Sequence, residues 1–239
     1  MYTIEGDLES CIAAIRAQEG VVTSHVIISG LKEKEAHNAL WRSWRDAQSS
    51  NDIFVKIDAD TVLASKDTLR QLCELFASDR RITGVQMPLH DYMTDGFING
   101  LNSFSTKVVF NDTKDELYCD RQVDTNHDRV LRDPNLPECL RPAGLHCHHA
   151  NEQQAFHYGL HRSLKGQSAN LDKVLNAWKR DRDRIRGFAL IGSRVSSEFV
   201  MSREFNYQDR QFTETFARVS KEYDRLIAEI ESGATHVNT

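Results

Sequence analysis

The chain has 239 residues, of which 40% are hydrophobic and 27% are charged, the proportions of an ordinary globular protein. Its formal net charge of −5 argues against nonspecific binding to nucleic acid or to an anionic membrane surface. No apolar run approaches the roughly 20 residues of a membrane span, and the N-terminus lacks the basic and apolar regions of a signal peptide. We therefore expect a soluble, cytoplasmic protein with no membrane span and no nucleic-acid partner.

The first third of the chain alternates between β-prone apolar runs and stretches with apolar residues at helical spacing. The pattern predicts strands over residues 2–4, 21–28, 53–57 and 82–87, and helices over residues 8–20, 33–48 and 67–78. Alternation at these intervals is typical of a parallel sheet with helices on both faces, joined by right-handed crossovers. The sequence therefore predicts an α/β fold for this part of the chain.

Two carboxylates, Asp58 and Asp60, directly follow the third predicted strand. In an open α/β sheet, ligands bind in the crevice beyond the carboxyl ends of the strands. Two acidic groups one residue apart repel one another unless a cation lies near them, and Mg²⁺ or Mn²⁺ prefers oxygen ligands of this kind. The alternative is a helix cap or a turn, which aspartate also favours. We favour the metal site, because the pair lies between a strand and a helix.

The sequence of residues 53–60, Ile-Phe-Val-Lys-Ile-Asp-Ala-Asp, resembles the corresponding motif of the GT-A glycosyltransferases, particularly the family-2-like enzymes. In that family the Asp-x-Asp motif binds a divalent ion and the diphosphate of a nucleotide sugar. The resemblance covers roughly residues 1–165. It implies a GT-A (nucleotide-diphospho-sugar transferase-like) catalytic domain over residues 1–166, built on a mainly parallel sheet flanked by helices, with a C-terminal helical extension over residues 167–239.

The same resemblance implies which early residues contact the nucleotide-sugar donor. Thr3 and Glu5, at the end of the first strand, correspond to a nucleotide contact. His37 and Asn38 stand where the family carries an Arg-Asn or similar pair on its second helix. The family often has an acidic residue after the second strand that binds the base, whereas this chain has a Ser-Gly pair at residues 29–30. The identity of the nucleotide therefore stays open.

Three histidines, His146, His148 and His149, lie within four residues and follow a Pro-Ala-Gly turn. Alternate residues of an extended segment point the same way, so His146 and His148 can face one site. Histidine is a capable ligand for Mn²⁺ or Zn²⁺. Many GT-A enzymes complete their metal shell with a histidine from the C-terminal half, and His146 is our preferred candidate. The alternative is a polar loop whose histidines cap the next helix or meet solvent.

The apolar spacing predicts a further helix over residues 151–165, one face of which carries Arg162 and Lys165. These two cations can neutralise a diphosphate leaving group. Alternatively, they are solvated basic residues late in a helix, where the helix dipole favours them.

Inverting members of the family commonly place a catalytic acidic residue just before such a helix, and Glu152 stands nearest to that position. The usual Glu-Asp pair of the family is Glu152-Gln153 here. Asp124 and Asp128, in the preceding loop, are therefore the alternative candidates for the catalytic base.

From residue 168 onward the pattern is helical, with two apolar stripes at three- and four-residue spacing. The stripes comprise Leu171, Val174, Leu175, Trp178, Ile185 and Phe188, and then Phe212, Phe216, Val219, Tyr223, Leu226 and Ile230. The charged run over residues 180–184 predicts an ion-paired, solvated stretch rather than a nucleic-acid patch. These helices can pack on the catalytic domain, pair with a second subunit in a homo-oligomer, or dock a further domain.

The five cysteines are an odd number without C-x-x-C spacing, which agrees with a cytoplasmic protein that has no disulfide framework. A zinc site formed by Cys119, Cys139, Cys147 and a nearby histidine is an alternative use of three of them. Its spacing matches no familiar zinc module.

The resemblance and the motifs together predict a Mn²⁺- or Mg²⁺-dependent, inverting glycosyltransferase of the hexosyltransferase type. It would move a sugar from a nucleotide-diphosphate donor to a hydroxyl acceptor, either a glycan or another molecule. Asp60 and His146, with His148, would bind the ion, and Asp58 would contact the ribose or the metal. Glu152 or Asp128 would deprotonate the acceptor hydroxyl.

Two other classes of protein are alternatives. One is a noncatalytic nucleotide- or partner-binding module on a GT-A scaffold, because a fold does not determine function. The other is a metal-dependent nucleotidyl- or phosphotransferase, which would also use paired carboxylates, although the sequence has no Gly-rich phosphate loop to support it.

Overall fold

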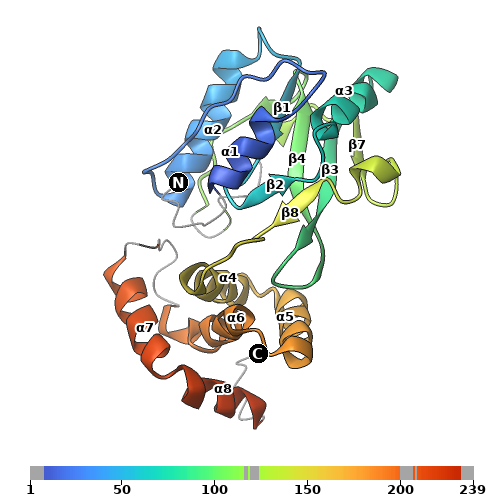
Figure 1. Cartoon of the computed structure of the whole chain (residues 1–239). Helices are drawn as coiled ribbons and strands as arrows, with labels where there is room; N and C mark the ends of the chain where they lie inside the picture. The colour runs from blue at the N-terminus through green and yellow to red at the C-terminus, as the bar shows by residue number, and fades with distance from the viewer. Residues whose placement is uncertain (1–7, 116–117, 119–123, 200–206, 208, 233–239) are drawn as a thin grey trace. The chain divides into compact units, whose positions relative to one another are not determined.

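A computed structural model describes residues 8–115, 118, 124–199, 207 and 209–232 (Figure 1). Contacts between residues divide the chain into two compact units. Of the described residues, the first unit takes in those from 8 to 92 and from 96 to 149, and the second takes in Met93–Asp95 and those after residue 149. The helix that follows His149 therefore groups with the C-terminal helices, whereas the sequence predicted a first domain that ends at residue 166.

The first unit contains a six-stranded sheet in the order β1-β4-β3-β8-β2, with β7 also paired to β3. Its strands are β1 (Ile53–Lys56), β2 (Thr61–Leu63), β3 (Ile82–Asp91), β4 (Gly96–Ser105), β7 (Arg129–Arg132) and β8 (Gly144–His146). A separate two-stranded sheet joins β5 (Val109–Phe110) to β6 (Asp124–Thr125).

The strand directions correct the expectation of a mainly parallel sheet. β4 is antiparallel to both β1 and β3, and β2 is antiparallel to β8, whereas β3 is parallel to β7 and β8. For β3 and β4 the reason is a hairpin: a turn over residues 92–95, with Asp95 in the left-handed region at φ 47°, returns the chain from β3 directly into β4. Antiparallel neighbours need only such a turn, while parallel neighbours need a crossover. The protein is therefore of the α/β class, with a mixed sheet.

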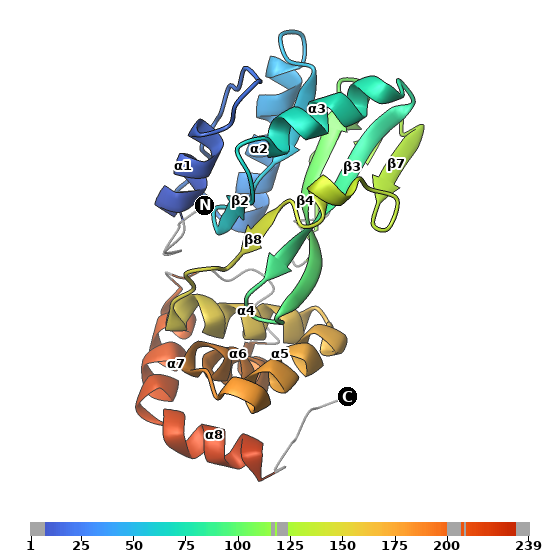
Figure 2. The ribbon, with the colours of Figure 1, turned by 45° about the vertical axis from the view of Figure 1, so that its right-hand side comes forward.

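Helices cover both faces of this sheet, as the sequence predicted (Figure 2). α1 (Leu8–Arg16) and α3 (Thr68–Ser78) pack on one face, and α2 (Glu33–Ala47) packs on the other. In β1, Ile53 and Val55 belong to the hydrophobic cluster of the first face, and Phe54 belongs to the cluster under α2. This alternation is the period of two that a strand imposes on its side chains.

The cluster under α2 is aromatic and lies next to the end of β1. Trp41 is fully buried and stacks on Phe110 with ring centroids 4.8 Å apart. Phe54 of β1 meets Trp41 edge-on at 6.1 Å and stacks on Trp44 at 5.3 Å. Offset-stacked and edge-on arrangements are those that aromatic rings prefer. The cluster thus anchors the strand that leads directly to Asp58.

The strand predicted over residues 21–28 is not formed. Residues 22–29 have no regular secondary structure, and Val22, Val26 and Ile27 are exposed. β-propensity measures how well a side chain fits a paired, half-buried surface, and no strand of the described residues pairs with this run. The strand predicted over residues 2–4 lies outside the described residues.

The second unit is helical. Its helices are α4 (Glu152–Leu164), α5 (Ser168–Asp181), α6 (Arg184–Arg194), α7 (Arg210–Lys221) and α8 (Tyr223–Glu231), with a short 3₁₀ helix, η2 (Ser196–Phe199), after α6. α4 and α6 approach closely at Gly159. A Cβ atom built at this position would overlap the carbonyl oxygen of Ala189 in α6. Both apolar stripes predicted from the sequence fall on helices of this unit.

The charged run over residues 180–184 is ion-paired, as predicted. Arg180 pairs with Asp95 at 2.6 Å, Arg184 pairs with Glu152 at 2.7 Å, and Arg182 pairs with Glu231.

Among the helices that the structure describes, none has the length and apolar character needed to cross a membrane.

Candidate metal centre

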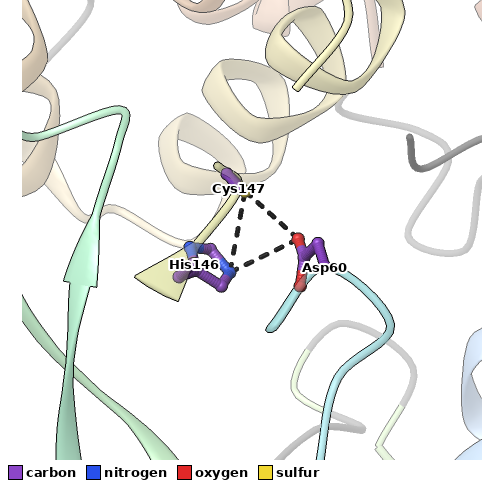
Figure 3. A group of neighbouring side chains, drawn as sticks. All are labelled: Asp60, His146 and Cys147. Atoms are coloured by element: carbon purple, nitrogen blue, oxygen red, sulfur yellow. Dashed lines mark hydrogen bonds and ion pairs between the residues drawn. The ribbon is translucent and has the colours of Figure 1, made fainter. Parts of the chain in front are cut away.

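Three side chains that can bind a metal, contributed by two distant parts of the chain, meet beside β2 and β8 (Figure 3). The Asp60 Oδ2 atom lies 3.4 Å from His146 Nε2 and 3.1 Å from Cys147 Sγ, and Nε2 lies 3.7 Å from Sγ. Within the described part of the chain, this is the one group of three such side chains close enough to share a metal ion. It contains Asp60 and His146, which the sequence predicted as metal ligands, and also Cys147.

Strand pairing brings these residues together. β2 runs antiparallel to β8 with Thr61 opposite His146, and the backbone N–H of Cys147 donates to the carbonyl oxygen of Asp60 at 3.0 Å. Cys147 has a φ of 55°, in the left-handed region that costs a non-glycine residue about 1–2 kcal/mol. Adjacent residues of a regular strand point to opposite faces. The left-handed turn ends that alternation, and the side chains of residues 146 and 147 both reach Asp60.

A buried carboxylate orients His146. Asp91, at the end of β3, lies beside His146 in the parallel register of β3 and β8, and its Oδ1 atom is 2.7 Å from His146 Nδ1. An ionised carboxylate only accepts hydrogen bonds, so Nδ1 carries the hydrogen and Nε2 faces Asp60. The sequence analysis missed Asp91. The feature that could have identified it is an aspartate that closely follows the strand predicted over residues 82–87.

The carboxylates also set the charge of His146. Burial by itself lowers the pKa of His146, but the negative charges of Asp60 and Asp91 outweigh burial and raise this pKa to about 9. Without a metal ion, the imidazole is therefore protonated at neutral pH. A metal ion must displace that proton, since only the neutral imidazole is a ligand.

Asp58 lies outside this three-residue group and pairs with a buried lysine. Lys56 Nζ donates to Asp58 Oδ1 at 2.7 Å, with the Lys56 side chain 8% exposed and the Asp58 side chain 43% exposed. Burial raises the pKa of Asp58, but the Lys56 ammonium, together with the charges of His37 and His146, outweighs that effect, so the pKa lies below its ordinary value. Asp58 is thus an anionic, partly exposed group beside the centre.

His148, the second histidine predicted to face the site, is exposed, and its ring contacts the ring of His149 at a centroid distance of 4.4 Å. It is not part of the group formed by Asp60, His146 and Cys147. The prediction assumed an extended segment beyond His146, whereas β8 ends at that residue.

His37 and Asn38, the two residues of α2 predicted to contact the nucleotide-sugar donor, bind backbone groups of the chain itself. The ring nitrogen Nδ1 of His37 lies 2.9 Å from the carbonyl oxygen of Glu33. The amide of Asn38 binds the backbone of Thr113 twice, donating at 3.1 Å and accepting at 2.7 Å, so it holds the segment after β5. Thr3 and Glu5 lie outside the described residues.

The predicted catalytic and phosphate-binding residues of α4 lie in the second unit. Glu152, the first residue of α4, accepts a hydrogen bond from Arg184 Nε at 2.7 Å. Arg162 donates to Gln167 Oε1 at 2.6 Å, and the side chain of Lys165 is buried.

The loop candidates for the catalytic base lie in the first unit. Asp128 is exposed, and its backbone N–H donates to Thr83 Oγ1 at 3.0 Å. Asp124 forms an ion pair with His127, with Oδ2 3.0 Å from Nε2.

Two of the three cysteines of the alternative zinc site, Cys139 and Cys147, lie in the described part of the chain. Cys139 is exposed on a 3₁₀ helix, η1 (Glu138–Leu140), and is not part of the group around Asp60. Cys147 is buried in that group, and Cys119 lies outside the described residues.

The donor set is suited to a divalent ion. A carboxylate oxygen and an imidazole nitrogen are both ligands that Mn²⁺ accepts, and a carboxylate behind a histidine is the usual outer support of metal-bound imidazole. A thiol is a soft donor that suits Zn²⁺ and not Mg²⁺. Asp60 and His146 thus fit the ion that the resemblance implies, while Cys147 fits a softer one.

No protein-family model, no curated protein and no solved structure matches this chain.

Proposed function

We propose that this protein is a divalent-metal-dependent glycosyltransferase, which moves a sugar from a nucleotide-diphosphate donor to a hydroxyl acceptor. One observation carries the proposal: Asp60 Oδ2 and His146 Nε2 lie 3.4 Å apart. The resemblance at residues 53–60 implies an aspartate of the Asp-x-Asp motif and a histidine from the C-terminal half as ligands of one ion. The proximity of these two side chains supports that implication, because nothing in the local sequence requires them to meet.

The residues of the centre have distinct tasks in this proposal. Asp60 offers an anionic oxygen, and His146 offers Nε2 while Asp91 retains the hydrogen on Nδ1. A bound divalent ion supplies positive charge that stabilises the departing nucleotide diphosphate. Asp58, held as an anion by Lys56, can accept hydrogen bonds from ribose hydroxyls.

The acceptor hydroxyl needs a base if the reaction inverts the anomeric configuration. The resemblance implies Glu152 as this base, and Asp124 and Asp128 are the alternatives. Asp128 is exposed, while Glu152 is engaged by Arg184 at 2.7 Å. Asp128 lies beside Thr83 near the start of β3, whereas the centre lies beside Asp91 at its end. Eight residues of strand span about 25 Å, so Asp128 is out of reach of a sugar bound at the centre, and we do not assign the role of base to it.

The experiment is a donor screen in the presence of Mn²⁺. A panel of UDP- and GDP-sugars is incubated with the protein and a mixture of glycan acceptors, and mass spectrometry detects the transferred or hydrolysed sugar. We expect turnover with one class of donor, which a chelator stops. Asp60→Asn and His146→Gln should each abolish turnover.

The matched control is Asp52→Asn, an exposed aspartate that precedes β1 and should leave turnover unchanged. Full activity of Asp60→Asn would refute the assignment of the centre. If calorimetry shows metal-dependent binding of UDP or GDP but no donor is turned over, the protein is a nucleotide-binding module and not an enzyme.

A further inference from the structure

We infer that Cys147 is a third metal ligand and that the centre takes a thiophilic divalent ion, such as Zn²⁺ or Co²⁺, in preference to Mg²⁺. The inference rests on the metal centre of the proposed function and not on the transfer reaction. It departs from the Mn²⁺ or Mg²⁺ that the resemblance implies, because the third donor beside Asp60 and His146 is a sulfur atom.

The distances between the three donor atoms support a common ion. With metal–ligand bonds of about 2.0 Å to oxygen, 2.05 Å to nitrogen and 2.3 Å to sulfur, tetrahedral ligands lie about 3.3 Å apart for the O and N pair and about 3.5 Å apart for pairs that include sulfur. The corresponding separations here are 3.4 Å for Asp60 and His146, 3.1 Å for Asp60 and Cys147, and 3.7 Å for His146 and Cys147. Each separation is within a few tenths of an ångström of the tetrahedral value.

The backbone at Cys147 provides an independent observation. Its φ of 55° is uncommon for a residue other than glycine, and such conformations cluster at functional sites. In an ideal continuation of β8 the Cys147 side chain would point away from the face of His146. The left-handed conformation instead carries Sγ to within hydrogen-bonding distance of Asp60 Oδ2.

The groups around its sulfur atom distinguish Cys147 from Cys11, the other buried cysteine of this unit. Cys147 is 2% exposed and borders a carboxylate and an imidazole, whereas Cys11, also buried, has a backbone carbonyl oxygen as its partner at 3.8 Å. A thiol that serves only as filling for the core would be placed among apolar side chains. Three ligands also leave one tetrahedral position for a water molecule or a substrate oxygen, as in catalytic metal sites.

Binding would convert the thiol into a thiolate. The Cys147 S–H bond breaks as the bond from sulfur to the metal forms, and the proton passes to solvent. The protonated His146 likewise releases its Nε2 proton before this nitrogen binds. No oxidant or reductant is needed, because neither sulfur nor metal changes its oxidation state.

Cobalt provides a readout that does not depend on activity. The metal-free protein is titrated with Co²⁺, and its absorption spectrum is recorded. We expect the intense near-ultraviolet band of a thiolate-to-cobalt charge transfer, together with the visible bands of a four-coordinate ion. The charge-transfer band should be missing in Cys147→Ser and should persist in Cys139→Ser, the control at an exposed cysteine.

Competition titrations with Zn²⁺ and Mg²⁺ give the affinities. Removing a partner that only supports a metal ligand typically weakens metal binding by about 10- to 100-fold. Cys147→Ser removes a ligand itself, so it should weaken Zn²⁺ binding by no less than this, and it should leave Mg²⁺ binding unchanged. An unchanged cobalt spectrum in Cys147→Ser would overturn the inference but would leave the proposed function intact, provided that Asp60→Asn still abolishes binding. Failure of the wild-type protein to bind any of these ions would overturn both.

Discussion

His146 Nδ1 lies 2.7 Å from Oδ1 of Asp91, a carboxylate whose side chain is completely shielded from solvent. A buried carboxylate is costly unless it is paired and hydrogen-bonded, so the imidazolium of His146 and Asp91 stabilise one another. The contact also determines which nitrogen of His146 faces Asp60. The orientation of the proposed metal ligand therefore depends on a residue from another strand.

The first prediction concerns this contact. Asp91→Asn keeps the size and the hydrogen-bond acceptor of Asp91 but removes its charge, so the pKa of His146 should fall clearly below its value of about 9. An NMR titration of the histidine ring signals in the metal-free protein measures this directly. Asp52→Asn, which changes an exposed aspartate, should leave the pKa unchanged. A His146 pKa that stays near 9 in Asp91→Asn would contradict this prediction and would leave Asp60 as the main cause of the raised pKa.

The second prediction is the pH dependence of stability without metal. The pKa of His146 is about 9 in the folded protein, against an ordinary value of 6.5. Its contribution to folding is fully present below pH 6.5 and is lost as the pH rises through 9, because the folded state then gives up the proton that it holds more tightly. The free energy of unfolding should therefore decline between pH 6.5 and 9.

Urea denaturation in the presence of a chelator, followed by circular dichroism at several pH values, tests this dependence. His146→Gln cannot gain or lose this proton, so its stability should decline less over the same interval. Parallel curves for the two proteins would show that another group is responsible.

The third prediction concerns the aromatic cluster under α2. Trp41 is fully buried and stacks on Phe110, so Trp41→Ala leaves a large cavity and should destabilise the protein by about 3–5 kcal/mol. Denaturation followed by circular dichroism gives the free energy of unfolding. Val22→Ala is the control, since Val22 is exposed and exposed substitutions usually change stability by less than about 0.5 kcal/mol.

The fourth prediction concerns the contact between α4 and α6. Replacing glycine by alanine within a helix normally stabilises it by about 1 kcal/mol. Gly159→Ala should do the opposite, because the new Cβ atom would overlap the carbonyl oxygen of Ala189. Overpacking of this kind typically costs about 1–3 kcal/mol, and a clash with backbone belongs at the upper end. Asn176→Ala, at an exposed position of α5, should be neutral or mildly stabilising, and an equal gain in Gly159→Ala would refute the close approach.

Much of the secondary structure follows from local patterns. Apolar residues at helical spacing correctly predict α1, α2, α3 and α4, and the alternation in β1 correctly predicts that Phe54 faces away from Ile53 and Val55. These features depend on residues a few positions apart, which share a face whatever the rest of the chain does. The run over residues 21–28 has the same local pattern but lacks a partner strand among the described residues, so it remains without regular structure.

The candidate site was predictable only in part. The sequence by itself identified Asp60, from its position after a strand, and His146, from the cluster of histidines and the family resemblance. It did not identify Asp91 or Cys147 as their neighbours. The pairing of β8 with β3 brings Asp91 to His146, and a single left-handed residue turns Cys147 toward Asp60.

The sequence alone therefore determined the helices α1 to α4, the strands β1 and β3, and the faces that these elements bury, because these features depend on local periodicity. The tertiary structure decided the strand directions, the register, and thus the set of side chains around Asp60. These depend on pairing between segments that lie far apart in the chain, where a shift of one residue exchanges the two faces of a strand.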